Sequence, residues 1–513
     1  MKESLRQSMA CLHTWAGLLF GWLLFVIFVT GTSAVFRQEI TRWMQPEVAA
    51  SAASRPQMIE NAARWLAREA KDTADWTITL PGNRGAAIEL FWSNADGGFE
   101  QAQLDPGGNR ITARETRGGE FLYRFHFELY GVSWLWGRWT VGIAAMLMLV
   151  AILSGVITHK KIFADFFMMR LRKGQRSWLD AHNVTGVLVL PFHIMITYTG
   201  LMTMATMYMP WGMVANYADP QKFYDAVYPY PSPPEKSGEA RPLAPIAPMA
   251  AAAESTLGQE IGSARILNAG DKTAQVILRG SAEDRLSARA TSITFDGVTG
   301  REIAREAPRQ AAAQTESVML GLHTARFAQP VLRWLYFISG LGGCAMTATG
   351  LILWTVKRRA KLPDPAHPHF GFRLVEKLNV ATIAGFPASV AVYFLANRLI
   401  PAEQAGRGRW EVNSLFIAWG VAALWAFARP ARRGWTELLT LAAALFALVP
   451  LVSWIETGRT LPQSLSEGDG VFVGFELTMF ALAAVFAYAA RKAGRHRLAA
   501  TPARVRRREA VAA

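Results

Sequence analysis

Eight apolar runs, most of them long enough to cross a membrane, constrain this chain more than any other feature of its sequence. A transmembrane helix needs about 20 predominantly apolar residues to cross a hydrocarbon core roughly 30 Å thick. The runs occupy residues 14–36, 136–158, 183–209, 331–355, 378–400, 413–428, 436–454 and 471–490. Because 51% of the 513 residues are hydrophobic, the sequence predicts an all-α membrane bundle of about eight helices rather than a soluble fold.

Positive charge is concentrated in alternate loops. The formal net charge of +15 is compatible with nucleic-acid binding, but the Lys and Arg residues gather at 160–176, 357–361 and 429–433 and in the tail from 491. Basic loops mark the cytoplasmic side of a membrane protein. We therefore expect a multi-pass protein in contact with membrane lipid, with both termini cytoplasmic and no nucleic-acid partner.

The hydrophilic stretches between spans complete the predicted organisation. Two segments of about 100 residues each show a helical pattern followed by alternating strands and Asp-containing turns, which predicts two small α+β periplasmic lobes; residues 210–250 read as an extended connector. The predicted order is a cytoplasmic start with the first span (1–36), lobe 1 (37–135), span two (136–158), a basic cytoplasmic loop (159–182), span three (183–209), lobe 2 (210–330), span four (331–355), a cytoplasmic linker (356–377), an appended bundle of spans five to eight (378–490) and a basic cytoplasmic tail (491–513).

The first and third spans can be aligned without a gap. HTWAG at His13 meets HNVTG at His182, and Gly31 meets Gly200, all at an offset of 169. Spans two and four also correspond, since the segments 139–155 and 334–350 each run from Trp to Gly and each follows a histidine. We therefore predict that the first four spans form a tandem repeat of two units with the same orientation.

Histidines cluster around these four spans. The six candidates for cofactor binding are His13, His126, His159, His182, His193 and His323. The stretch 178–209 reads as one helix that presents His182 and His193 from one face, and an ionisable residue at membrane depth is usually functional. A single histidine at a helix mouth, however, often only caps or reaches the interface.

Two pairings of these histidines are open from the sequence. Repeat symmetry favours His13 with His182 and His126 with His323, which gives one bis-histidine site at each membrane face. In the alternative pairing, His182 shares the inner site with His13 or His159, and His193 shares the outer site with His126 or His323.

Imidazole donors without a nearby thiolate or carboxylate set favour iron over zinc. The sequence has no CxxCH motif for covalent haem attachment and no GxGxxG motif for a nicotinamide module. We therefore expect two b-type haems, with His13, His182, His126 and His323 as the axial ligands of the haem iron.

The segments HTWAG…TG, HNVTG…TG, FHFELYG and GLHTARF, and the run SGVITHKKIFADFF followed by WLDAHN and LPFHIMITYTGL, resemble the PepSY-associated transmembrane helix family over residues 1–360. Members of this family are bacterial inner-membrane proteins and include iron-uptake proteins and ferric-siderophore reductases that bind b-type haem through histidines. The resemblance implies PepSY-like periplasmic lobes and an electron conduit, and it does not extend to spans five to eight.

The function expected from these observations is a di-haem b inner-membrane reductase. Electrons from a quinol or a cytoplasmic reductase would cross the membrane and reduce a periplasmic ferric chelate or siderophore during iron uptake. Two alternatives belong to other classes: a permease component for iron or siderophore uptake, and a non-catalytic PepSY-type sensing or regulatory protein.

Overall fold

The protein is described here by a computed structural model. It describes residues 4–495 except 49–52, 71–72, 74, 83, 86, 94–97, 160–161, 163–168, 171–172, 228–233, 284 and 307–309. The chain divides into two compact units, of which the first comprises Met1–Pro363 with Ile400–Arg409 and the second comprises Asp364–Leu399 with Trp410–Ala513. Much of the predicted basic tail and of the loop after span two lies outside the described residues.

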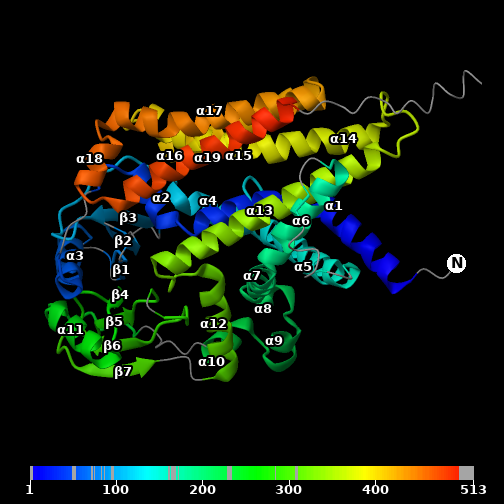
Figure 1. The fold of residues 1–513 in the computed structure, drawn as a ribbon. Helices are drawn as coiled ribbons and strands as arrows, with labels where there is room; N and C mark the ends of the chain where they lie inside the picture. The colour runs from blue at the N-terminus through cyan, green and yellow to red at the C-terminus, as the bar shows by residue number, and fades with distance from the viewer. Residues whose placement is uncertain are drawn as a thin grey trace, which may run out of the picture. The chain divides into compact units, whose positions relative to one another are not determined.

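Seven helices in the described part of the chain are long and apolar enough to cross a membrane, or up to eight if one bent pair is counted as a span. The chain is therefore a multi-pass membrane protein. In the first unit, α1 (Leu5–Ala34) packs along α5 (Trp134–Thr158) and α13 (Pro330–Arg359) (Figure 1). The helices extend beyond the apolar runs because their polar first and last turns continue the backbone hydrogen bonds.

The third span is bent. Instead of one helix over 178–209, the structure has α6 (Gln175–Leu188) and α7 (Leu190–Met202), which meet at an angle of 65°. Pro191 lies in the first turn of α7, where it has no N–H to continue the hydrogen bonds of α6 and its ring excludes a straight continuation. The prediction that His182 and His193 share one face of one helix is therefore wrong.

Two further helices lead into the second and fourth spans. Helix α4 (Gly118–Glu128) precedes α5 and packs on α1, and α12 (Ala311–Thr324) precedes α13 and packs on α7. Both segments fall within the predicted lobes. Since they pack against spans, the histidines that they carry lie beside the membrane helices, although they precede the apolar runs by about ten residues.

Within the described residues, seven strands form one antiparallel sheet with the order β3-β2-β1-β4-β5-β6-β7. They are β1 (Trp76–Thr79), β2 (Ile88–Ser93), β3 (Phe99–Leu104), β4 (Ile261–Leu267), β5 (Gln275–Gly280), β6 (Ser292–Asp296) and β7 (Glu302–Glu306). The two lobes predicted from the sequence are thus parts of one sheet, joined where Trp76 pairs with Ile266 and Ile78 pairs with Ala264.

One apolar core lies between this sheet and two helices, α3 (Arg55–Glu69) and α11 (Ile246–Leu257) (Figure 1). Alternate residues of β2 are buried, as expected for a sheet with one covered face. The predicted extended connector 210–250 instead contains the short helices α9 (Trp211–Asn216) and α10 (Pro220–Val227) and the start of α11.

The second unit contains the remaining candidate spans. They are α14 (Phe370–Asn379), which continues through the π-helical η1 (Val380–Ala384) into α15 (Gly385–Leu399), then α16 (Arg407–Ala428), α17 (Ala431–Thr457) and, after the short α18 (Leu461–Ser466), α19 (Gly470–Arg495). The carboxylate of Glu476 is buried in this bundle and accepts a hydrogen bond from Trp454 at 2.8 Å. A second buried carboxylate, Glu411, accepts one from Asn397 at 2.7 Å.

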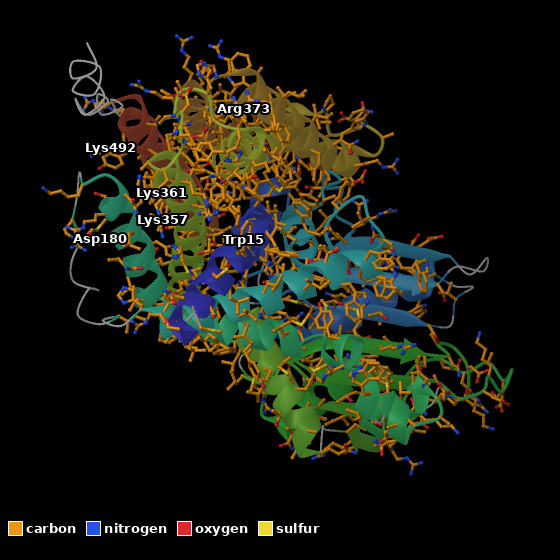
Figure 2. The ribbon with its side chains drawn as sticks, turned by 90° about the vertical axis from the view of Figure 1, so that its right-hand side faces the viewer. Trp15, Asp180, Lys357, Lys361, Arg373 and Lys492 are labelled. Carbon is orange, nitrogen blue, oxygen red and sulfur yellow. The ribbon has the colours of Figure 1, made fainter. Side chains whose placement is uncertain are left out.

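The orientation in the membrane can be tested with reporter fusions. Lys357 and Lys361 lie at the same end of the α6–α13 pair as Asp180 (Figure 2), and basic residues favour the cytoplasm. A reporter inserted after Arg172, outside the described residues, should therefore show a cytoplasmic location. Insertions after Asp105 and Asp296 should both show a periplasmic one.

Asp105 directly follows β3 and Asp296 ends β6, and both strands belong to one sheet. The reporters at Asp105 and Asp296 must therefore agree. Opposite signals from these two positions would contradict the fold, and a periplasmic signal at Arg172 would invert the topology.

Candidate functional site: two histidine pairs

The inner pair consists of His13 on α1 and His182 on α6, whose ring centroids are 6.1 Å apart with an interplanar angle of 67°. His13 Nδ1 lies 2.8 Å from the carbonyl oxygen of Ala151, and His182 Nδ1 lies 2.9 Å from that of Met346. A carbonyl oxygen only accepts, so each Nδ1 carries the proton. Each Nε2 therefore keeps a lone pair that can bind a metal.

The outer pair consists of His126 on α4 and His323 on α12, with ring centroids also 6.1 Å apart and an interplanar angle of 29°. Their Nδ1 atoms donate to the carbonyl oxygens of Ile27, at 2.8 Å, and Ile196, at 3.0 Å. Burial lowers the pKa of His323 to about 3 and also lowers that of His126. Burial therefore favours the neutral form of both imidazoles, which is the form that binds a metal.

Four glycines make room for the four imidazoles. A Cβ atom added to Gly31 would lie 2.6 Å from His126, and one added to Gly200 would lie 2.7 Å from His323. At the inner pair, the corresponding distances are 3.1 Å from Gly155 to His13 and 3.0 Å from Gly350 to His182. Each ring therefore lies directly against the backbone of a neighbouring helix, where any larger residue would displace it.

These contacts recur at constant spacing along the chain. The residues of α1 that act in the pairs reappear 169 positions later in α6 and α7: His13 and His182, Ile27 and Ile196, Gly31 and Gly200. Those of α5 reappear 195 positions later in α13: Ala151 and Met346, Gly155 and Gly350. The two halves of the first unit thus supply the same donors, carbonyls and glycines.

The spacing of each pair fits an iron between two imidazoles. With metal–nitrogen bonds of about 2 Å and a ring centroid roughly 1.2 Å beyond the nitrogen, two opposed imidazoles place their centroids about 6.4 Å apart. The observed 6.1 Å is close to this value. Each pair offers two imidazole nitrogens, and within the described residues no group of three His, Cys, Asp or Glu side chains is arranged to hold a metal ion.

His193 and His159 lie outside both pairs. The His193 ring is fully buried, with its centroid 5.8 Å from that of Phe28, and neither ring nitrogen has a hydrogen-bond partner in the described part of the protein. Its counterpart at the offset of 169 is Leu24, so it has no equivalent histidine. His159 Nε2 lies 3.0 Å from the Asn183 amide nitrogen. The structure thus pairs His13 with His182 and His126 with His323, as repeat symmetry predicts. The alternative partners, His159 and His193, belong to neither pair.

A cavity of about 770 Å³ extends from the outer pair to the sheet. Its walls include residues of the spans, such as Phe192 and Tyr336, and of strands β1, β4 and β5. Six arginines also line it: Arg37, Arg55, Arg84, Arg138, Arg279 and Arg326. Sequence reasoning did not find these arginines or the roles of Gly155 and Gly350. The two glycines could have been found in the sequence, because they occupy corresponding positions in spans two and four.

Two comparisons relate this chain to known proteins. A family model described as the PepSY-associated TM region matches residues 10–357. The chain is also 28% identical over 349 residues to Uncharacterized protein PA4219 of Pseudomonas aeruginosa, an alignment that covers 63% of this chain and 84% of that protein. The matched region contains both histidine pairs and the sheet, and ends within α13. The chain belongs to the PepSY-associated transmembrane family.

Proposed function

We propose that this protein is a di-haem b reductase of the bacterial inner membrane, which carries electrons across the membrane to a ferric chelate on the periplasmic side. The observation that carries the proposal is the presence of two imidazole pairs with the same centroid separation, each ring fixed through Nδ1 to a backbone carbonyl. His13 and His182 would hold the inner haem, and His126 and His323 the outer one.

We further propose that residues 1–360 are a tandem repeat whose extramembrane halves are PepSY-like. The constant offsets of the site residues support this, as does the division of the sheet into β1–β3 from the first half and β4–β7 from the second. A pseudo-twofold axis along the membrane normal would relate the halves. Such an axis explains why each pair takes one histidine from each half.

The protein's own groups have three tasks in this reaction. A bound haem supplies a site that gains and loses one electron. The carbonyls of Ala151, Met346, Ile27 and Ile196 accept the Nδ1 protons, which fixes the tautomer and the orientation of each ring and increases the basicity of Nε2. The glycines admit the rings between closely packed helices.

The cavity has room for a substrate only beyond the outer haem. The part lined by His126 and His323 would hold that haem, and the part walled by β1, β4 and β5 would hold the chelate. Conversion of Fe(III) to Fe(II) weakens the hold of hard oxygen donors on the metal, which releases iron for uptake. The electron donor is a quinol or a cytoplasmic reductase.

Optical spectroscopy tests the proposal. The full-length protein, expressed with adequate haem supply and purified in detergent, should show a b-type Soret band that shifts on reduction and about two haems per chain by pyridine haemochrome analysis. A ferric chelate should reoxidise the reduced protein. Absence of a Soret band would refute the reductase and would favour a permease or a sensing protein, in which the histidines serve structure.

A further inference from the structure

Arg326 lines the same cavity as the outer histidine pair. It follows His323 by three residues, just after Ala325 ends α12 in the left-handed region with φ of 51°. Arg326 is an exposed residue that lines the cavity, and its guanidinium donates a hydrogen bond to the hydroxyl of Tyr123. Tyr123 in turn precedes His126 by three residues on α4, so both halves of the first unit contribute to this contact.

Tyr123 also brings a second guanidinium to the same place. The guanidinium carbon of Arg37 lies 4.7 Å from the centre of the Tyr123 ring, while Arg326 contacts the hydroxyl. One aromatic side chain thus holds two cations at the cavity wall.

The carboxylates near this wall are too few to balance the arginines. Glu39 is shared by Arg84 and Arg333, at 2.6 and 3.2 Å. Glu120 is likewise shared by Arg37 and Arg124, at 3.4 and 3.2 Å. The third carboxylate, Glu128, is shared by Arg138 and Arg124.

Five guanidiniums therefore share three carboxylates, and Arg326 is a sixth. Among the residues that the structure describes, no carboxylate lies within ion-pair distance of Arg326. Glu283 also lines the cavity, so six guanidiniums face four carboxylates, and an excess of two positive charges remains beside the outer pair.

The membrane orientation of the protein does not explain this excess of positive charge. In the proposed orientation the cavity opens on the periplasmic side, where short loops are poor in Lys and Arg. Exposed guanidiniums in a concave site suit a ligand that carries anionic oxygen atoms, because the planar fork binds carboxylate and related groups through two parallel hydrogen bonds.

We propose that the outer part of the cavity is an anion-binding site, with Arg326, Tyr123 and Arg37 as its contacts, that selects ferric chelates of net negative charge. The role of this site in reduction rests on the proposed function, but the binding of anionic chelates to the site does not. Carboxylate, catecholate and phenolate chelates fit this site. A chelate with net positive charge meets the uncompensated guanidiniums and is rejected.

Redox-inert gallium chelates separate binding from electron transfer. The probes are gallium(III) tris(catecholate), a trianion, and the gallium(III) complex of a linear tris-hydroxamate with a free ammonium group, a monocation. Full-length protein should bind the trianion at least about 10-fold more tightly than the monocation, and salt should weaken binding of the trianion.

Arg326→Gln should weaken binding of the trianion by about 10- to 100-fold without affecting binding of the monocation, whereas Arg326→Lys should retain most of the affinity for the trianion. Tyr123→Phe should weaken it by a smaller factor.

The matched control is Arg305→Gln, which removes an exposed guanidinium of β7 that pairs with Glu302 at 3.1 Å and should change neither affinity. Equal affinity of the unmodified protein for both probes would overturn the proposal. So would unchanged affinity in Arg326→Gln with a lowered haem content, which would assign Arg326 to the carboxylates of the haem itself. Selective gallium binding by a protein without a Soret band would refute the reductase and leave this site standing.

Discussion

Replacing His182 by alanine should remove one of the two haems. The inner pair then retains only His13, whose single imidazole leaves iron at most five-coordinate, so the low-spin spectrum of that site must disappear. The haem content should fall from about two to about one per chain, and the remaining haem should keep the potential of the outer site. Pyridine haemochrome analysis combined with a redox titration measures both quantities.

Two variants act as controls for this result. His367→Ala should change nothing, since His367 is an exposed side chain beside Asp364 in the second unit. His193→Ala should keep both haems, because His193 belongs to neither pair, although the space left by a fully buried ring should lower the melting temperature. Loss of a haem in His193→Ala, with both retained in His182→Ala, would exclude the symmetric pairing.

Replacing Gly31 by alanine should abolish the outer haem without removing a ligand. The new Cβ atom would lie 2.6 Å from both Cε1 and Nδ1 of His126, far inside van der Waals contact. Because helix packing in this region is dense, the ring must move away from its position. We expect loss of the low-spin signal of the outer haem, loss of ferric reduction and an intact inner haem, measured by electron paramagnetic resonance and by chelate reduction.

Gly17 provides the matched control on the same helix. A Cβ atom at Gly17 would meet nothing within 4 Å. Gly17→Ala should therefore leave both haems in place and stabilise α1 by about 0.5–1 kcal/mol, the usual gain when alanine replaces glycine inside a helix. Equal spectra for Gly31→Ala and Gly17→Ala would contradict the placement of His126 against α1.

The residues that pair in the structure were largely visible in the sequence. Apolar length alone located the membrane helices, because a hydrocarbon core admits few other structures. The register of His13 against His182 and of Gly31 against Gly200 then indicated which histidines to pair. The acceptors of the Nδ1 protons were not visible, since any residue can supply a backbone carbonyl.

Other features depended on three-dimensional context. Pro191 stood inside the predicted third span, but a membrane helix can often accommodate a proline, so its presence did not decide between a kink and a break. Alternation of apolar and polar residues identified β1 and β4 but carried no information about which strands would be neighbours. The arginines of the cavity come from segments far apart in the chain, and no local pattern connects them.

The joined sheet has a consequence for how the protein is made. Trp76 pairs with Ile266, which the ribosome adds 190 residues later, or roughly 10–40 s at 5–20 residues per second. Until then, β1 reaches the far side of the membrane with an open edge of unpaired N–H and C=O groups, which readily captures other chains. A nascent chain that stalls after the second span is therefore an aggregation hazard rather than half of a working protein. Slow synthesis prolongs this exposure, so a chaperone on the side of the sheet would protect the edge of β1 until β4 pairs with it.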